Sequence, residues 1–330
     1  MKKDKVHQFN TDIRNGSNVA MPIAPSECET LEYENISIDT STQSIRHAYS
    51  TLGFLTVRMP RQFTEIIGSI HSVNRNFFDL PDQIKNKIIY DQIRQPAYSN
   101  IGYYPMDVEK AQSTKVPDRK EFLHIGRSPA EVPDEFGLYT DIPWPKEIRH
   151  FGAEYRRFYD TLAVYSEQIF LAIAKAFGLD SEYCKHFIHN GNSILRCIHY
   201  PPISTESSAM RAAPHHGMNL IGVQVKSTHP GLQFCTSNDE WVYLDDWPDD
   251  VVTVNIGRML AYMLNGRAKP TLHRVVNDLA GSNVEHRYTS VLFFHGNPNM
   301  EIQPLPGSQE LPKLTVAEWT GKRLKDIGIR

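Results

Sequence analysis

Hydrophobic residues in the first half of the chain recur at helical spacings. Ile45, Ala48, Tyr49 and Leu52 are three or four positions apart, which predicts a helix from about Thr42 that Gly53 ends. The run 54–57 then predicts a short strand. The same helical pattern predicts a helix over about 61–78, stopped by Leu80-Pro81, and a long helix over about 151–177 that Gly178 closes. Residues 92–148 are rich in Pro, Gly and Tyr, so we expect loops with brief strands there.

After Ser193 the pattern changes to short β-rich runs between turn residues. These runs are 194–198, 221–225, 231–234, 241–244, 251–256, 271–276 and 290–294. Several short strands with turns at close spacing are typical of a sandwich or a jelly roll. Helices first and strands second predict an α+β protein. We divide it into a loose N-terminal arm (1–30), an N-terminal helical region (31–185), a jelly-roll domain (186–305) and a C-terminal tail (306–330).

Composition places the chain among globular proteins and gives no reason to expect a polyanionic partner. Hydrophobic residues make up 40% of the 330 residues and charged residues 22%, which is a globular balance. The formal net charge is only -3. So mild a charge gives no reason to expect electrostatic capture of nucleic acid or of an anionic membrane surface.

Cysteine usage and hydropathy predict a cytoplasmic protein. The four cysteines, Cys28, Cys184, Cys197 and Cys235, include no Cys-x-x-Cys pair, so we expect four free thiols in a reducing compartment. The basic N-terminus is not followed by the apolar stretch of an ordinary secretory signal. The most apolar stretch, 251–264, contains an Asn and an Arg and is too short to span a bilayer.

The candidate chemistry lies in the β-rich half, as an ordered set of motifs and not as single residues. His215 stands in the run Pro-His-His-Gly-Met-Asn-Leu-Ile (214–221), and His273, 58 residues later, in Thr-Leu-His-Arg-Val-Val (271–276). Arg287-Tyr288-Thr289 follows 14 residues beyond His273, and Tyr200 lies upstream in His-Tyr-Pro-Pro (199–202). A lone histidine is more often structural than a ligand, so the spacing of the set carries the interpretation.

The ordered set resembles the isopenicillin N synthase-like branch of the iron(II)/2-oxoglutarate dioxygenases. In that family a His-x-Asp motif is followed by a distal His with Arg-Val after it, and then by Arg-x-Ser. The matching residues here are His215, His273 and Arg287-Tyr288-Thr289, with Thr in place of Ser. Further matches in the N-terminal half extend the resemblance from about Ile36 to Met300.

The resemblance implies a double-stranded β-helix (jelly roll) core with a helical N-terminal region packed against it. It also implies that His215 and His273 bind Fe(II), with 2-oxoglutarate and O2 as co-substrates and a small molecule as substrate. Iron(II) accepts imidazole and oxygen ligands. Arg287 would bind the far carboxylate of 2-oxoglutarate in bidentate fashion, with hydroxyl groups added by Thr289 and Tyr200. The ordinary alternatives are a surface ion pair for Arg287 and a half-buried strand tyrosine for Tyr200.

One departure from the family motif changes the expected chemistry. The residue two after the first histidine is a carboxylate in the usual triad, but here it is Gly217. A competing register places His216 on the metal and Met218 in the carboxylate position. Neither register supplies an Asp or Glu.

Four hypotheses account for the missing carboxylate. In the one we prefer, Gly217 leaves room for chloride, as in the halogenating members that this pattern resembles, and the enzyme chlorinates an unactivated carbon. Alternatively, water fills the position in a hydroxylase or oxidase; or His216 or a remote carboxylate such as Asp239 or Glu240 binds the metal; or the chain is a silent ligand-binding relative. A carrier protein for the substrate is compatible with the sequence but not indicated by it.

Two charged segments have an ordinary interpretation beside a functional one. The run Asp118-Arg119-Lys120-Glu121 is usually a solvated turn, but in similar proteins it lies near the active-site mouth, so Phe122 and His124 could face the substrate. Arg211 could bind an anionic substrate, although such an arginine is more often part of a rim salt bridge of little energetic value.

Overall fold

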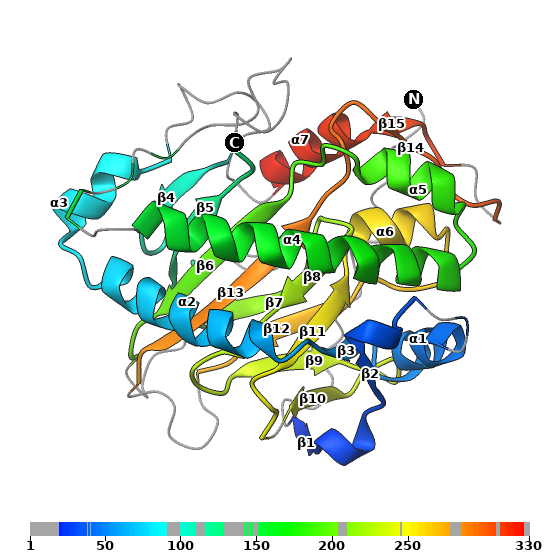
Figure 1. The fold of residues 1–330 in the computed structure, drawn as a ribbon, viewed down its shortest axis with the longest axis horizontal. Coiled ribbons are helices and arrows are strands. Elements are labelled where there is room, and N and C mark those ends of the chain that lie inside the picture. Colours follow the sequence, from blue (N-terminus) through cyan, green and yellow to red (C-terminus); the bar gives the residue numbers. More distant parts are fainter. Residues whose placement is uncertain are drawn as a thin grey trace.

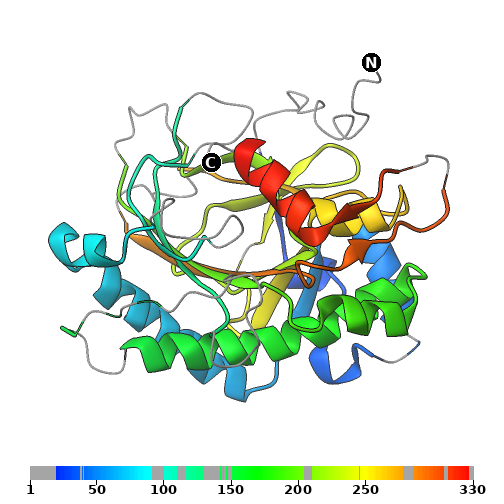
Figure 2. The ribbon, with the colours of Figure 1, turned by 90° about the horizontal axis from the view of Figure 1, so that it is seen from above.

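Two β-sheets face each other at the centre of the protein, and helices cover the outer face of the larger sheet (Figure 1, Figure 2). The computed structural model describes residues 20–37, 39, 41–90, 100–109, 116–128, 142, 144, 146–147, 151–203, 210–244, 246–277, 285–307 and 311–326.

The described chain contains an eight-stranded sheet, a five-stranded sheet and a two-stranded sheet. The eight-stranded sheet has the order β2 (Thr30–Glu32), β3 (Leu55–Arg58), β11 (Val251–Ile256), β8 (Ile221–Gln224), β13 (Arg287–Phe294), β6 (Ile194–Tyr200), β5 (Glu121–Ile125) and β4 (Gly102–Tyr104). The five-stranded sheet has the order β1 (Met21–Ile23), β10 (Trp241–Leu244), β9 (Leu232–Cys235), β12 (Leu272–Val275) and β7 (Ala212–His216). β14 (Glu301–Ile302) pairs with β15 (Leu314–Thr315).

The helices lie mainly before the jelly roll in the sequence. They are α1 (Ser41–Thr51), α2 (Gln62–Phe78), α3 (Asp82–Lys85), α4 (Phe151–Ala176), α5 (Ser181–Ile188), α6 (Arg258–Met263) and α7 (Val316–Asp326), with short 3-10 helices at Pro25–Glu27, Tyr33–Asn35 and Asn86–Ile88. Helix α4 contacts α1, α2 and the central strands β8 and β13. It therefore joins the helical layer to the middle of the larger sheet (Figure 1).

Strand alternation separates the two faces of the larger sheet. On β8 and β13 the side chains of Val223 and Leu292, both fully buried, belong to the core beneath the helices. Val291 points the other way and packs with Val275 of the smaller sheet. Because successive side chains on a strand point to opposite faces, Gly222 and Arg287 also lie on the inner face, between the two sheets.

Most of the elements expected from the sequence are present, with differences of a few residues at their ends. Gly53 and Gly178 have φ angles of +81° and +85° just after α1 and α4, the left-handed conformation typical of a glycine that ends a helix. The strands over 241–244 and 251–256 match β10 and β11 at both ends. Within 92–148, β4 and β5 are the brief strands; the predictions for 92–99, 110–115, 129–141, 143, 145 and 148 fall outside the described residues.

The two chain ends differ from the sequence interpretation. In the expected loose arm, residues 21–23 form β1 and pair in parallel with β10, while 1–19 lie outside the described residues. The expected tail contains β15 and α7, and Trp319 of α7 is 3% exposed, with its Nε1 donating to the Met218 carbonyl at 2.9 Å. Helix α6 was also not expected, because only Gly257 separates it from β11 and most residues on both sides are apolar.

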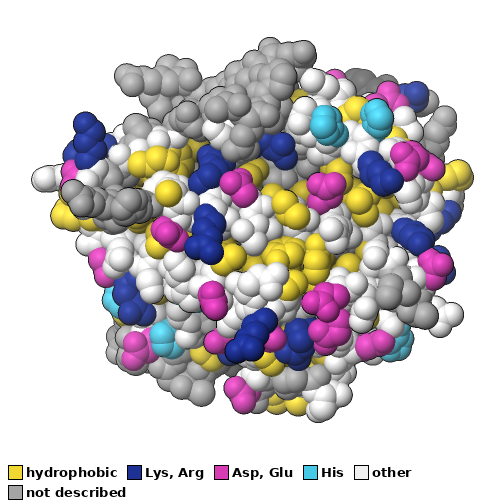
Figure 3. Space-filling model, viewed as in Figure 1, with side chains coloured by type: hydrophobic (Ala, Val, Ile, Leu, Met, Phe, Trp, Pro, Cys, Tyr) yellow, Lys and Arg dark blue, Asp and Glu magenta, His cyan; other side chains and the backbone are white. Residues whose placement is uncertain are grey.

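The surface and the cysteines agree with the composition. Side chains of both charges are interspersed over the face viewed in Figure 3, as the net charge of -3 leads one to expect. All four cysteines are free thiols, as predicted. Among the described residues, no helix combines the length and the apolar character needed to cross a membrane.

Two positions on α4 provide a test of this packing. Leu162 is fully buried, whereas Val164, on the same helix, is 60% exposed. Leu162→Ala should lower the free energy of unfolding by about 2–5 kcal/mol, because it removes buried contacts and leaves a cavity. Val164→Ala should change it by no more than about 0.5 kcal/mol. Urea unfolding measures both, and equal losses would contradict the placement of α4.

Candidate metal and 2-oxoglutarate site

His215 and His273 lie opposite each other on two neighbouring strands. β7 pairs with β12 in antiparallel fashion, and its register places His215 directly across from His273. Their ring centroids are 4.3 Å apart, with an interplanar angle of 54°. Side chains directly opposite in an antiparallel pair lie on the same face. The strands therefore bring the two predicted ligands to one point on the inner face of the smaller sheet.

Backbone hydrogen bonds fix the orientation of both rings. Nδ1 of His215 donates to the Ala213 carbonyl at 2.8 Å, and Nδ1 of His273 donates to the Thr271 carbonyl at 3.1 Å. Burial lowers the pKa of His215 to about 4 and the pKa of His273 to about 3. Each ring is therefore neutral near pH 7, with the lone pair on Nε2, the form in which histidine binds a metal.

The other register receives no support from the strand geometry. His216 follows His215 on β7 and pairs with Leu272, not with His273. Strand alternation directs its side chain to the opposite face. The inner face of β7 and β12 thus presents His215 with His273.

The described residues offer no third metal ligand of the usual kind. Among them, no group of three or more His, Cys, Asp or Glu side chains is arranged to hold a metal ion. Asp239 and Glu240, the remote carboxylates considered from the sequence, are exposed in the turn between β9 and β10. In this structure neither of them completes the site.

The space beside Gly217 is filled, contrary to our expectation of room for a halide. A Cβ atom added at Gly217 would lie 2.5 Å from Oδ1 of Asn219, closer than real Cβ contacts come. Asn219 is 1% exposed. The far end of its side chain therefore lies against the Cβ position of residue 217, so the open space that favoured chloride is not found on that side of Gly217.

Arg287 is buried at the inner face of β13, not in a surface ion pair. It is 0% exposed; its Nη2 donates to Ser227 Oγ at 2.8 Å and its Nε to the His229 carbonyl at 3.0 Å. Tyr200 is its cross-strand partner on β6, with the ring centroid 5.0 Å from Cζ of Arg287. Tyr200 is 3% exposed, so the half-buried alternative is also wrong.

Thr289 lies on the same face of β13, two residues after Arg287. It is fully buried; its Oγ1 donates to the Val225 carbonyl at 3.3 Å, and Gln224 Nε2 donates to it at 3.4 Å. The hydroxyl thus sits beside the arginine, as Arg-x-Thr spacing on a strand requires. The structure brings Arg287, Tyr200 and Thr289 together.

One nitrogen of the Arg287 guanidinium is available to donate a hydrogen bond to an anion. Nη1 is buried and has no hydrogen-bond partner within the described part of the chain. No carboxylate of the described residues forms an ion pair with Arg287, and burial lowers its pKa to about 10. A buried cation without a counter-ion is costly. A carboxylate ligand would satisfy both its charge and its free N–H group.

Arg287 and the histidine pair both lie on inner faces of the jelly roll, between the two sheets. A Cβ at Gly231 would lie 3.5 Å from Cγ1 of Val275 and 3.7 Å from Nε of Arg287, so the arginine reaches β12. Val275 is two residues after His273 and shares its face. The chemistry of these residues fits a metal at the two histidine nitrogens and a carboxylate ligand at Arg287.

Three of the four residues in the charged run 118–121 are buried, and the side chain of Arg119 is 40% exposed, so the run as a whole is not a solvated turn. Lys120 is 5% exposed, and its Nζ lies 2.7 Å from Asp118 Oδ2 and 2.7 Å from Glu109 Oε2. Asp118 Oδ1 accepts a hydrogen bond from the Ala213 backbone N–H at 3.0 Å. Ala213 is two residues before His215, so this cluster supports the strand that carries the first histidine.

Phe122 and His124 lie on the inner face of β5 but pack against protein groups. Arg196 Nε donates to His124 Nε2 at 2.7 Å, and Cζ of Arg196 lies 4.1 Å from the Phe122 ring centroid. Their contact with substrate stays a prediction. Arg211 is buried and does not lie at a rim: it is 0% exposed, and its Nη2 donates to the Glu285 carbonyl at 3.0 Å.

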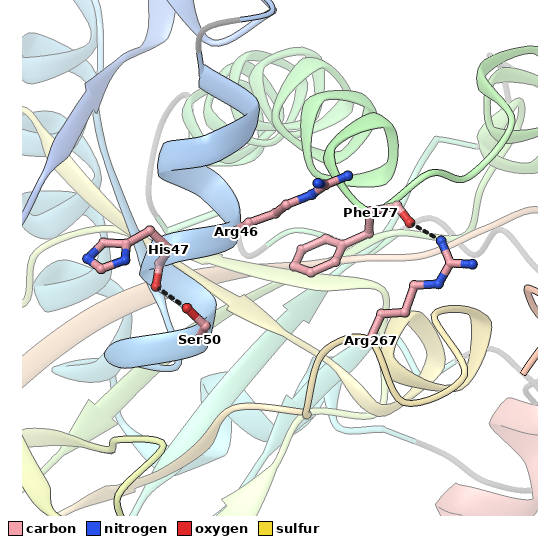
Figure 4. A pocket seen from close by; sticks show the side chains of 5 residues that line it. All are labelled: Arg46, His47, Ser50, Phe177 and Arg267. Atoms are coloured by element: carbon pink, nitrogen blue, oxygen red, sulfur yellow. Dashed lines mark hydrogen bonds between the residues drawn. The ribbon is translucent and has the colours of Figure 1, made fainter. Parts of the chain in front are cut away.

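A separate pocket at the end of α4 has a structural explanation (Figure 4). It is lined by Arg46, His47, Ser50, Phe177 and Arg267. Nη1 of Arg267 donates to the Phe177 carbonyl at 2.9 Å, and Nε of Arg46 donates to the Ala176 carbonyl. Both arginines thus satisfy carbonyl groups at the helix C-terminus.

Two residues of the site were not identified from the sequence. Asn219 served only to set the motif register, and Glu109, which holds Lys120 and Arg196, was not considered. The signal for Asn219 was a polar residue two positions after the missing carboxylate. Glu109 carried no signal, because its partners are distant in the sequence.

Two family models match the chain, and together they span more than half of it. Residues 30–147 match the N-terminal domain described as non-haem dioxygenase in morphine synthesis, and residues 191–296 match the 2OG-Fe(II) oxygenase superfamily. The second match contains both histidines, Gly217 and Arg287.

Relatives and solved structures agree with these matches. The 2-oxoglutarate-dependent dioxygenase tropC of Talaromyces stipitatus is 28% identical, over 81% of this chain and 83% of its own. Gibberellin 20 oxidase 2 of Arabidopsis thaliana is 26% identical, over 84% and 68%. A crystal structure assigned to the 2OG-Fe(II) oxygenase family, from Caulobacter crescentus, is 26% identical with a TM-score of 0.77, covering 91% of this chain and 99% of that one. The chain belongs to the 2OG-Fe(II) oxygenase superfamily and is an iron(II)- and 2-oxoglutarate-dependent oxidoreductase.

Proposed function

We propose that the protein hydroxylates or otherwise oxidises a small organic molecule, with iron(II) on His215 and His273 and 2-oxoglutarate on Arg287. The observation that carries this proposal is the buried Nη1 of Arg287, which has no hydrogen-bond partner among the described residues, together with the cross-strand histidine pair. The gibberellin named for one relative supports a small organic substrate. Bound together, iron(II) and 2-oxoglutarate would supply the oxidation of a substrate C–H bond by O2.

The residues of the chain have separate tasks in this reaction. The neutral rings of His215 and His273 provide two fixed nitrogen ligands. Arg287 orients the co-substrate through its far carboxylate, while Tyr200 covers the guanidinium and keeps water from it. The hydroxyl of Thr289 lies beside the same carboxylate position. The walls of the jelly roll exclude water from the reacting atoms.

Halogenation is the second candidate function. The observation that favours it is the absence of a carboxylate at position 217 and of a third metal-binding side chain among the described residues. Asn219 in the gap counts against it. The relatives reported above are named as a dioxygenase and an oxidase, which favours oxidation.

The metal assignment predicts different results for neighbouring histidines. His215→Ala and His273→Ala should abolish binding of Fe(II) or Co(II), because each removes one of two side-chain nitrogens. His216→Ala should retain binding, because its ring lies on the other face of β7. Calorimetric titration of the metal-free protein measures all three. Loss of binding in His216→Ala with retention in His215→Ala would establish the competing register.

The co-substrate assignment predicts a specific loss of affinity. Arg287→Gln should weaken 2-oxoglutarate binding by roughly ten- to a hundredfold, the equivalent of about 1.5–3 kcal/mol for a charge-assisted hydrogen bond. Metal affinity should be nearly unchanged. Arg274→Gln is the control, because Arg274 is also buried but stacks on Trp241, with Cζ 4.0 Å from its ring centroid. Unchanged 2-oxoglutarate affinity in Arg287→Gln would refute the assignment.

Product mass separates the two candidate functions. Wild-type protein is supplied with iron(II), 2-oxoglutarate, O2 and a panel of small aromatic and terpenoid substrates, with and without saturating chloride or bromide. Oxidation predicts succinate formation and a product with added oxygen or lost hydrogen, whatever the halide. A product that contains the halogen would refute the oxidase proposal in favour of the halogenase.

A further inference from the structure

The loop 225–231, between β8 and β9, holds one edge of the Arg287 guanidinium. Residues 226–229 of this loop are partly exposed, whereas Arg287 is 0% exposed. Nη2 of Arg287 donates to Ser227 Oγ at 2.8 Å, and Nε donates to the carbonyl groups of His229 and Pro230 at 3.0 and 3.2 Å. The loop therefore engages the guanidinium from the side that lies nearer to solvent.

The contacts on this edge determine where the third nitrogen of Arg287 points. A guanidinium is planar, and its N–H groups form a rigid fork. Nε–H and one N–H of Nη2 lie along the same edge, which the loop occupies. Nη1 lies away from that edge, and it is the buried nitrogen that lacks a hydrogen-bond partner among the described residues. The loop thus directs the nitrogen that we assign to the co-substrate carboxylate.

The hydroxyl of Ser227 is oriented to accept from Arg287. Its only proton is donated to the His229 carbonyl at 2.8 Å, so its lone pairs face the guanidinium. The same carbonyl accepts the hydrogen bond from Nε of Arg287. Ser227, His229 and Arg287 thereby form a closed ring of hydrogen bonds. Alanine at position 227 would open this ring and leave Nη2 free to move.

The position of Ser227 is set by the residues on either side of it. The backbone N–H of Thr228 donates to the Tyr288 carbonyl at 3.0 Å, and Oγ1 of Thr228 accepts from the Tyr288 N–H at 2.9 Å. Nε2 of His71, on α2, donates to the Lys226 carbonyl at 2.9 Å. The loop is therefore fixed to β13 and to α2, and Ser227 lies between two anchored residues.

The end of the loop is joined to the strand that carries His273. The N–H of Val276, directly after β12, donates to the Gly231 carbonyl at 2.9 Å. Gly231 has a φ of +132°, and a Cβ there would lie 3.1 Å from the Val276 carbonyl oxygen, so glycine suits this approach. Since the loop holds Arg287 and is bonded to the end of β12, it relates the guanidinium to the histidine pair.

We propose that Ser227 is a positioning residue for 2-oxoglutarate: its hydroxyl fixes the guanidinium edge of Arg287, and with it the span between Nη1 and the metal, so that a dicarboxylate of this length is preferred. This inference rests on the proposed function. Ser227 acts through Arg287 and has no contact of its own with the co-substrate. The selectivity for chain length is therefore the property that it should control.

Calorimetric titration of Co(II)-loaded protein with 2-oxoglutarate and with 2-oxoadipate, which is one carbon longer, tests this role without turnover. Ser227→Ala should bind 2-oxoglutarate roughly three- to tenfold more weakly, because a hydrogen bond to a charged group is lost. Its preference for 2-oxoglutarate over 2-oxoadipate should fall by at least about threefold, because the freed guanidinium adjusts to the longer acid. Co(II) affinity should be unchanged. Ser227→Thr keeps the hydroxyl and should retain the wild-type values.

Thr228→Val is the matched control for a lost hydroxyl in the same loop. The hydroxyl of Thr228 bonds to the backbone of Tyr288 and not to the guanidinium. This variant should lower the melting temperature but keep the wild-type affinity and the wild-type preference. An equal loss in Thr228→Val would show that general loosening of the loop causes the effect, and it would overturn the role of Ser227.

A double variant shows whether Ser227 acts through the arginine. In the Arg287→Gln background, Ser227→Ala should cause no further loss of 2-oxoglutarate affinity, since its target is already gone. A full additional loss would mean that Ser227 acts independently of Arg287, contrary to this inference.

The outcomes also separate this inference from the function on which it rests. If Ser227→Ala keeps the wild-type affinity and preference while Arg287→Gln loses affinity, the co-substrate site stands and Ser227 does not position it. If neither variant changes 2-oxoglutarate binding, the proposed function and this inference both fall.

Discussion

The pairing of β7 with β12 is the constraint on which the site depends. It places His215 opposite His273, and a slip of β7 by one residue would turn His215 to the other face. Contacts outside these two short strands also stabilise the pairing. Asp118 accepts a hydrogen bond from the backbone of Ala213, and Lys120 holds Asp118 within a buried cluster that extends to Glu109 and Arg196. Burying these charges is tolerable only because each is paired.

Much of the fold was predictable because its elements are strongly periodic. Helix α4 has a buried stripe over seven turns, and Gly178 marks its end. Where one element leads into the next without a change in composition, the sequence contains no boundary signal. Helix α6 follows β11 through buried apolar residues, and only the backbone contacts of Gly257 show why the chain turns there. Strand β1 was missed because its partner β10 lies more than 200 positions away.

The spacing of the motifs was enough to predict which residues belong to the candidate site. The structure pairs His215 with His273 and groups Arg287 with Tyr200 and Thr289, residues that the motif spacing singles out. Burial and occupied volume were not predictable, because they depend on contacts between distant segments. Four charged residues that look like surface charge in the sequence are buried in the structure: Asp118, Lys120, Glu121 and Arg211. Gly217 suggested a gap, but only coordinates could show that Asn219 fills it.

The contact between positions 217 and 219 limits which residues this stretch of chain tolerates. A Cβ atom at position 217 would meet Oδ1 of Asn219, so a residue larger than glycine requires the Asn219 side chain to turn away. Asn219 is 1% exposed, so its side chain can turn only into volume that the packed interior leaves open. Substitutions at 217 and 219 are therefore coupled, and their effects on the free energy of unfolding should not add.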